Sequence, residues 1–408
     1  MDLHVLKNSN TRSLFIGQAF SQVCDKMMSV GLVWVVAESF GAFWVPIYTA
    51  LVTLPHLALA PWNGPLVTKF GALKTVIHTS SIRAVILLAA AGLALLFSNS
   101  PSHYLLATLF VVGLSSGIVG AFFNPAILSL PVRIARAPED VGPITALIDS
   151  TYSISNVAGP LLSVLAFTAL GLPGLLLLTG ASFGFAAWTA SRVTETTRDS
   201  EVVSSPAPPE QAWKILSRHP LIARTLMAFL LLNLVIAPIA VFFPAYTREV
   251  YAGGIGGYAA LEIALGLGMI LGGLLLTLIP VQRTGRLIVG SIFLIAISYF
   301  VFTVSRNAVL GSFAAFAIGL GASLANISIL GYFQSDAPAG EIAQIMSVVN
   351  LISVACVPVS MAILTVLLPW VGLRPLAIVC ATAYVGLAFL IYYLPGLRGI
   401  TLTRIQPA

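Results

Sequence analysis

Long runs of apolar residues follow one another along the chain, and polar residues collect in the short stretches between them. Two of these runs, Ala84 to Phe97 and Leu261 to Ile279, lack the alternation of apolar and polar residues that a membrane β-barrel requires. A helix needs about 20 apolar residues to cross a hydrocarbon core about 30 Å thick. This rule predicts twelve membrane-spanning helices, at residues 13–37, 43–66, 75–97, 104–130, 143–169, 172–190, 222–246, 257–280, 287–304, 308–333, 342–369 and 372–394.

Most connections between the predicted helices are short, but one is long. Thr194 to His219 is rich in Ser, Pro, Glu and Arg, which is typical of a cytoplasmic linker. Within it, Glu210 to Arg218 is amphipathic enough to lie along the membrane surface, and a solvated turn is the alternative. The predicted domains are an N-terminal six-helix bundle, a cytoplasmic linker and a C-terminal six-helix bundle, at residues 1–193, 194–220 and 221–408.

The composition supports a membrane protein, because 58% of the residues are hydrophobic, 8% are charged and the mean hydropathy is +0.99. A soluble domain carries roughly 25% charged residues, so the expected fold class is all-α integral membrane. Cys24, Cys356 and Cys380 lie inside predicted helices and are interpreted as small core residues rather than as a disulfide or zinc framework. The polar segment Met1 to Arg12 leads directly into the first helix, so no removable signal peptide is expected.

The net charge of +6 comes from basic residues scattered among short loops, so nucleic-acid binding is not expected. Their positions predict the topology instead, because cytoplasmic loops carry an excess of Lys and Arg. One set of alternate loops and helix ends holds Lys7, Arg12, Lys69, Lys74, Arg133, Arg136, Arg192, Arg198, Lys214, Arg218, Arg224, Arg283, Arg286, Arg398 and Arg404. The other set holds only Arg248, Arg306 and Arg374. Both termini and the linker are therefore expected on the cytoplasmic side of the inner (plasma) membrane.

The two halves share a weak internal repeat with an offset of about 200 residues, close to half the chain. In each half an asparagine and a cytoplasmic Pro/Glu segment precede a helix that contains a proline. The two copies are Asn124, Pro138-Glu139 and Gly159-Pro160, and Asn326, Pro338 to Glu341 and Val357-Pro358. Such repeats predict two pseudo-symmetric six-helix halves, with a substrate site at their interface near the midplane of the membrane.

The segment Gly64-Pro-Leu-Val-Thr-Lys-Phe-Gly-Ala-Leu-Lys74 resembles the signature G-x-L-a-D-r-x-G-r-k between helices 2 and 3 of the major facilitator superfamily. The resemblance extends over essentially the whole chain, and it implies a transporter of the major facilitator fold that works by alternating access. Gly64, Lys69, Gly71 and Lys74 match the gating loop of this family. Thr68 stands where the family has an acid.

Two further segments resemble family signatures. Gly159-Pro160 is similar to the core of the antiporter signature in helix 5, with Ser163 where a glycine is typical. Phe122-Phe-Asn-Pro-Ala126 and Ile154 to Pro160 are similar to the macrolide-efflux type of exporters, a subgroup that includes siderophore exporters. The signature arginine of helix 4 is missing, because Ser115, Ser116 and Gly117 occupy that region.

Asp25 and Lys26 lie near the middle of the first predicted helix, where a charge costs roughly 2.5–3.5 kcal/mol and usually faces a polar cavity. Neighbouring residues point about 100° apart, so these two side chains cannot pair with each other. The polar residues Gln18, Gln22, Asp25 and Ser29 recur at helical spacing and are the leading candidate for a cavity wall. The alternative is that Asp25 only anchors helix packing through a hydrogen bond.

A second polar stripe, Asp149, Tyr152 and Asn156, lies on the fifth predicted helix. Asp149 is interpreted as a counter-ion for Lys26 or as a proton site, and the alternative is an acid in contact with cytoplasmic water. The remaining candidates for substrate or proton binding are Asn124, Asn233, Glu262, Asn326 and Asn350. Glu262 lies near the outer end of the eighth predicted helix, and the alternative for it is a solvated acid.

Three other polar residues have simpler interpretations. His56 is expected to be a satisfied packing residue, and His78 and Arg83 are expected to reach the cytoplasmic interface from the first turns of the third helix.

In the eighth helix, Gly266-Leu-Gly268 and Gly272-Gly273 are expected to let a neighbouring helix approach closely.

The combined interpretation is a proton-coupled exporter of a small molecule such as a drug, a siderophore or another metabolite, with Asp25 and Asp149 as the titratable groups. ATP is not the expected energy source, because the chain has no G-x-x-x-x-G-K-[ST] loop. The expected partners are the substrate, protons and membrane lipid. The protein is expected to be monomeric and to use no cofactor.

Other functions stay open. A lysophospholipid flippase is one alternative, because that family also has an Asp in helix 1 and an acid in helix 5. A ferroportin-like divalent metal exporter is another, because Asp25-Lys26-Met27 is similar to a short pattern of that family, and Asp25 would then be a metal ligand. A transporter-like sensor is a third. An intramembrane enzyme is not expected, because the chain has no Ser/His/Asp, His-Glu-x-x-His or paired-Asp motif.

Overall fold

A computed structural model of the chain describes residues 5, 7–96, 102–135, 137–194, 218–278, 284–336 and 341–393. Its regular elements are helices throughout these ranges. In the first part of the chain they are α1 (Ser9–Phe40), α2 (Trp44–Ala58), α3 (Ala60–Phe70), α4 (Ala72–Leu96), α5 (Ser102–Ile134), the short 3-10 helix η2 (Pro138–Asp140) and α6 (Val141–Ala190). The later ones are α8 (Pro220–Ile236), α9 (Ile239–Glu249), α10 (Ile255–Leu278), α11 (Thr284–Val304), α12 (Ala308–Asp336), α13 (Ile342–Val371) and α14 (Leu373–Tyr393).

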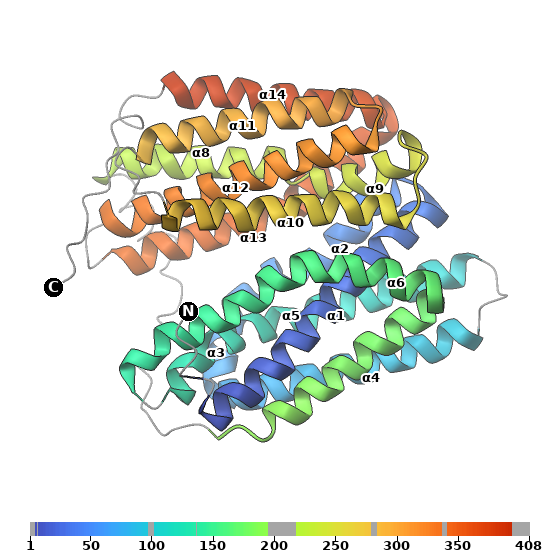
Figure 1. The fold of residues 1–408 in the computed structure, drawn as a ribbon, viewed down its shortest axis with the longest axis vertical. Coiled ribbons are helices and arrows are strands. Elements are labelled where there is room, and N and C mark those ends of the chain that lie inside the picture. The colour runs from blue at the N-terminus through green and yellow to red at the C-terminus, as the bar shows by residue number, and fades with distance from the viewer. Residues whose placement is uncertain are drawn as a thin grey trace. The chain divides into compact units, whose positions relative to one another are not determined.

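The described helices account for twelve membrane spans. Ten spans pass a test of length and hydropathy, one of them joining α8 and α9, and the pair α2 and α3, bent by 60° at its break, makes an eleventh. The twelfth arises inside α6, whose 50 residues would extend about 75 Å if straight, more than twice the hydrocarbon thickness. Gly171, with φ 64° and ψ −166°, breaks this helix so that the chain reverses direction (Figure 1). A residue with a Cβ rarely adopts this conformation.

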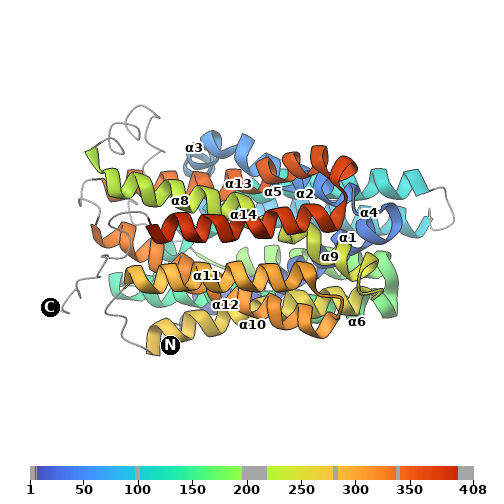
Figure 2. The same ribbon diagram turned by 90° about the horizontal axis from the view of Figure 1, so that it is seen from above.

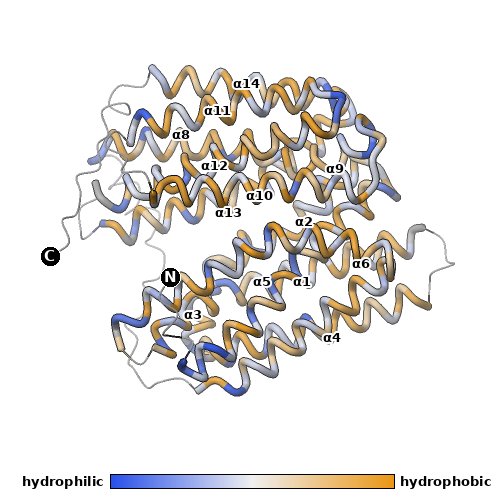
Figure 3. The backbone as a smooth tube through the Cα atoms, viewed as in Figure 1, coloured by the Kyte–Doolittle hydropathy of each residue, from blue (hydrophilic) through white to orange (hydrophobic). Residues whose placement is uncertain are grey.

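The surfaces of these helices suit a lipid environment. Apolar residues run along every labelled helix, and strongly hydrophilic residues lie mainly at helix ends (Figure 3). Large apolar side chains in the middle of helices are exposed, including Val85 at 67% and Ile297 at 61%. Because a bilayer offers no hydrogen bonds, only helices that satisfy their own backbone groups are stable there.

The chain forms two compact units, Met1–Ser205 and Pro206–Ala408. Within each unit the helices run roughly side by side in both views (Figures 1 and 2). In the first unit α5 packs on α2 and α4, and α6 packs on α1 and α4. In the second unit α12 packs on α10 and α11, α14 packs on α11 and α8, and α8 packs on α13. Counted by order of their spans, the same helices pair in both units, which is the pseudo-symmetry predicted from the internal repeat.

The twelve predicted helices therefore correspond to observed spans, with ends that differ by several residues. Residues 195–217 lie outside the described residues, so the predicted linker and its amphipathic segment Glu210 to Arg218 stay predictions. At the start of that region Asn10 Nδ2 donates hydrogen bonds to the carbonyl and hydroxyl oxygens of Thr194, at 2.9 and 3.0 Å, and so joins the start of α1 to the residues that follow α6.

Helices α10 and α12 cross closely at the glycines of α10, as the glycine pattern predicted. A Cβ built on Gly268 would collide with the carbonyl oxygen of Phe316 in α12, and one on Gly272 would lie 2.8 Å from the carbonyl oxygen of Leu320. The absence of these side chains allows α10 and α12 to approach backbone to backbone, where van der Waals packing holds helices together in lipid.

This crossing predicts that Gly268→Ala destabilises the protein, because overpacking a tight contact costs about 1–3 kcal/mol. Gly290→Ala in α11 is a matched control, since nothing lies within 4 Å of the Cβ built there. Both sites lie inside helices and gain the same helix propensity, about 1 kcal/mol. Thermal unfolding in detergent is expected to show a lower melting temperature for Gly268→Ala only. Equal melting temperatures for the two variants would contradict the close crossing.

Candidate functional site

A cavity of about 340 Å³ lies inside the first unit, between α1, α2, α4, α5 and α6. Each of these five helices contributes at least one polar side chain or small residue to the lining, and Arg83 is the contribution of α4. The lining residues are Gln22, Asp25, Met28, Ser29, Leu32 and Val33 of α1, Tyr48, Thr49, Val52, Thr53 and His56 of α2, Arg83 of α4, Gly113, Ser116, Gly117, Phe123 and Asn124 of α5, and Tyr152 of α6.

An ion pair between α1 and α4 lies at the wall of this cavity. Arg83 Nη1 is 3.7 Å from Asp25 Oδ2, and Arg83 Nη2 donates a hydrogen bond to the carbonyl oxygen of Ser116 at 3.1 Å. The guanidinium carbon lies 4.9 Å from the ring centroid of Phe183 and 5.6 Å from that of Phe123, which is cation–π range. Arg83 is 8% exposed, so its charge is held inside the bundle by these contacts.

The expectation that Arg83 reaches the cytoplasmic interface is wrong. Helix α4 begins at Ala72, so Arg83 stands about 16 Å along a helix of 25 residues, near its middle. At that depth the guanidinium turns to Asp25 instead of reaching the helix end. The rule that drew attention to Asp25, a charge in the middle of an apolar helix, applies equally to Arg83 and would have identified it.

The neighbouring helix α5 makes room for this arginine. A Cβ built on Gly120 would lie 2.5 Å from Arg83 Nη2 and 3.1 Å from His56 Nε2. The region of α5 where the family signature has an arginine supplies a backbone acceptor, the carbonyl of Ser116. The cationic group of the cavity therefore comes from α4.

The predicted stripe on α1 divides between the cavity and the helix core. Gln22, Asp25 and Ser29 line the cavity, whereas Gln18 is buried and is not part of its wall. The hydroxyl of Tyr152 is within hydrogen-bonding reach of the Gln22 side chain. His56, expected to be a packing residue, also lines the cavity.

Lys26 lies on the face of α1 that contacts α6. A Cβ built on Gly159 would lie 2.7 Å from Lys26 Cβ and 3.1 Å from the backbone nitrogen of Met27. Gly159-Pro160, the antiporter-like motif, is therefore the place where the backbone of α6 approaches α1. Asp149 is exposed and, like Lys26 and Asn156, is not among the residues that line the cavity.

The other predicted asparagines lie in both units. Asn124 is exposed and lines the cavity of the first unit. Asn233 donates a hydrogen bond from Nδ2 to the carbonyl oxygen of Phe229 in its own helix, at 2.8 Å. Asn326 of α12 and Asn350 of α13 are exposed.

Across the described ranges, no group of three or more His, Cys, Asp and Glu side chains is arranged to hold a metal ion.

The predicted gating loop forms the turn from α3 to α4. Gly71, with φ 86°, separates the two helices, and Lys69 and Lys74 are exposed on either side of it. The Thr68 hydroxyl donates a hydrogen bond to the carbonyl oxygen of Gly64 at 3.0 Å. The position that the family signature gives to an acid is thus satisfied within its own helix.

A sequence profile described as "Major Facilitator Superfamily" matches residues 14–358. The chain belongs to the Major Facilitator Superfamily. It is similar to the uncharacterized MFS-type transporter YvqJ of Bacillus subtilis (strain 168), with 23% identity over 361 residues that cover 86% of this chain and 83% of YvqJ. Membership makes the protein a multi-pass membrane transporter and implies a small-molecule substrate.

Two solved structures share the facilitator fold. A point mutant of the nucleoside transporter NupG gives a TM-score of 0.70 at 12% identity, covering 94% of this chain and 98% of NupG. The human organic anion transporter MFSD10 (TETRAN) gives a TM-score of 0.61 at 10% identity, covering 94% of this chain and 99% of MFSD10. Identities this low show the common fold alone.

The ion pair predicts a coupling in stability between Asp25 and Arg83. Asp25→Asn leaves the buried guanidinium without its counter-charge, which costs up to about 3–5 kcal/mol for a fully buried pair and less here because the Asp25 side chain is 34% exposed. Thermal unfolding of Asp25→Asn, Arg83→Met and the double variant is expected to show that the double loses less than the sum of the singles. Asp25→Asn combined with Lys74→Met, a change at an exposed lysine, serves as the control and should be additive. Additivity for Asp25 and Arg83 as well would contradict the pair.

Proposed function

We propose that this facilitator is a proton-coupled exporter of a small molecule, of the type that includes macrolide and siderophore exporters. The observation that supports the proposal most directly is the pairing of Asp25 with Arg83 at the wall of a polar cavity. A carboxylate in such a place can exchange one partner for another without leaving the cavity, and the competing partners are Arg83, a proton and the substrate.

Competition for Asp25 is the physical basis of exchange. When Asp25 is ionised, its carboxylate pairs with Arg83 or accepts a hydrogen bond from a donor group of the substrate. When a proton binds, the carboxyl group loses its attraction for both, and the substrate is released. Proton and substrate therefore do not occupy Asp25 together.

The driving force is sufficient for export. A proton that moves down a membrane potential of about 100 mV releases roughly 2.3 kcal/mol, and each unit of pH difference adds about 1.4 kcal/mol. In this proposal the two six-helix halves, joined by the linker of residues 194–220, rock around the substrate, and the loop from Gly64 to Lys74 contributes to gating. Asp149 is the second titratable candidate. The protein works as a monomer in the inner (plasma) membrane.

The ion pair also favours protons over metal ions as the species that binds Asp25. A divalent cation next to Asp25 would meet the positive charge of Arg83 at the same carboxylate. A proton neutralises the carboxylate without adding a second positive charge. The ferroportin-like alternative is for this reason less well supported than proton-coupled export.

The proposal predicts that Asp25→Asn abolishes uphill transport while leaving the protein in the membrane. The amide keeps a hydrogen-bond acceptor but cannot bind or release a proton at physiological pH. Uptake of a radiolabelled macrolide into inverted, energised membrane vesicles is the measurement, with a radiolabelled siderophore as the second probe. Transport by wild type should collapse when a protonophore is added, and Asp25→Asn should fall to the level of vesicles without the protein.

Asp149→Asn at equal membrane abundance is the comparison, because Asp149 is the second titratable candidate and lies outside the cavity wall. Wild-type transport by Asp25→Asn across the working pH range would remove Asp25 from the mechanism. Uphill transport that persists in the presence of the protonophore would instead rule out proton coupling.

The proposed topology makes a separate prediction. With both termini and the linker in the cytoplasm, single cysteines introduced at Thr194 and His219 should react with a membrane-impermeant maleimide only after the cells are opened. A cysteine in place of Arg306 should react in intact cells, since that connection lies in the opposite set of loops. Labelling of the linker from outside would refute the assignment.

A further inference from the structure

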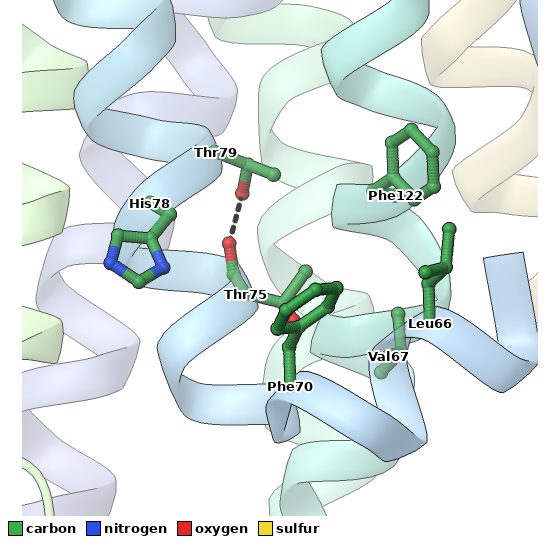
Figure 4. Close-up of a pocket in the computed structure, with 7 residues that line it drawn as sticks. All are labelled: Leu66, Val67, Phe70, Thr75, His78, Thr79 and Phe122. Carbon is green, nitrogen blue, oxygen red and sulfur yellow. Dashed lines mark hydrogen bonds between the residues drawn. The ribbon is translucent and has the colours of Figure 1, made fainter.

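A second cavity, a groove of about 320 Å³, lies where α3 turns into α4. Its walls come from three helices of the first unit (Figure 4). They consist of Leu66, Val67 and Phe70 of α3, Thr75, His78 and Thr79 of α4, and Phe122 of α5. The groove shares no residue with the polar cavity around Asp25 and Arg83.

The groove is apolar in practice although two threonines line it. The Thr75 hydroxyl donates to the carbonyl oxygen of Gly71 at 2.8 Å, and the Thr79 hydroxyl donates to the carbonyl oxygen of Thr75 at 2.7 Å, the bond drawn in Figure 4. Both hydroxyls are thus satisfied by their own helix. Leu66, Val67, Phe70 and Phe122 supply an apolar wall that suits a hydrocarbon chain, and His78, which is exposed, is the remaining polar residue of the lining. A volume near 300 Å³ is at the small end of ligand cavities.

The rim of this groove is positive. Lys69 Nζ lies 5.9 Å from the ring centroid of Phe70, a groove residue that is 59% exposed, so the ammonium group is close to the opening. Lys74 is exposed on the first turn of α4. Residues 39–138 contain no Asp or Glu, and position 68 is an uncharged threonine whose hydroxyl is already bonded. Within this stretch of chain, no acid opposes an anion at the rim.

We propose that this groove binds one anionic phospholipid of the bilayer, with an acyl chain against the apolar wall and the phosphate at Lys69 and Lys74. An apolar groove next to paired cations matches the two parts of such a lipid. A zwitterionic lipid matches less well, because the stretch without acids offers no partner for its positive headgroup. Trp62, 58% exposed on the same helix, suits the level of the headgroups, where aromatic residues are enriched. The inference is independent of what the protein transports.

The test is a lipid titration of the full-length protein in detergent, followed by native mass spectrometry. The probes are palmitoyl-oleoyl phosphatidylglycerol, which is anionic, and palmitoyl-oleoyl phosphatidylcholine, which is zwitterionic. One phosphatidylglycerol should remain bound at concentrations where phosphatidylcholine dissociates. The double variant Lys69→Ala/Lys74→Ala should bind phosphatidylglycerol about 25-fold more weakly, since each basic residue near a membrane surface contributes roughly a factor of five.

Two further variants separate the parts of the proposed site. Arg306→Ala removes an exposed cation of the second unit and should leave lipid binding unchanged. Leu66→Trp fills the groove and should weaken phosphatidylglycerol binding although both lysines remain. Equal affinity for the two lipids, or an equal loss in Arg306→Ala, would overturn the proposal. Full binding by Leu66→Trp would likewise overturn it, because the acyl chain would then lie elsewhere.

Discussion

A charge in the middle of a membrane helix is costly unless it finds a partner inside the bundle, and this constraint organises the surroundings of Asp25 and Arg83. Asp25 on α1 and Arg83 on α4 satisfy it at the wall of the cavity, where their charged groups lie 3.7 Å apart. Their pairing explains why α5 carries Gly120 beside the guanidinium and offers the carbonyl of Ser116 to it. The aromatic rings of Phe123 and Phe183 complete the surroundings of the arginine. Side chains that look unrelated along the chain thus serve a single ion pair.

Glycines at helix crossings are the second feature on which the structure depends, and in both units they allow two helices to pack closely. In the first unit Gly159 lets α6 approach α1 at Lys26, and in the second unit Gly268 lets α10 approach α12. Lipid provides no hydrophobic force between helices, so association depends on how closely their backbones can pack. Placing glycines at the crossings leaves the remaining helix surface free for large apolar side chains that face the bilayer. Most of the apolar content of the chain is therefore available for lipid contact.

The fold was predictable because each span is a simple run of apolar residues, and the length of a run is set by the thickness of the bilayer. The site was predictable in part. Gln22, Asp25 and Ser29 share one helical face, so their common exposure to a cavity follows from helix geometry alone. Arg83 was misplaced because the third helix was taken to begin near residue 75 instead of Ala72, which put the arginine closer to the membrane surface than it is. Three residues of helix, about 4.5 Å, changed its interpretation.

The contact between Gly159 and Lys26 and the role of Gly120 depend on which faces of distant helices meet, and no local pattern contains that information. Local pattern also does not show that Gln18 of α1 is buried in the core whereas Gln22, one turn later, faces the cavity. Tertiary packing decides such cases, because one turn of a helix can bring a polar residue under a neighbouring helix.

The two units have matching helix pairings but different chemistry. Asp25, Lys26 and Arg83 all lie deep within helices of the first unit. The predicted candidates of the second unit are Glu262 of α10 and three asparagines, one of which bonds to its own helix. A duplicated backbone does not require duplicated charges. Each buried charge is costly, and a proton site needs only one carboxylate with one competing cation. The second unit packs through glycine crossings and a buried aromatic cluster that includes Tyr246 and Phe302, with ring centroids 4.9 Å apart. The two units thus share one plan of helix pairing and differ in the charges placed on it.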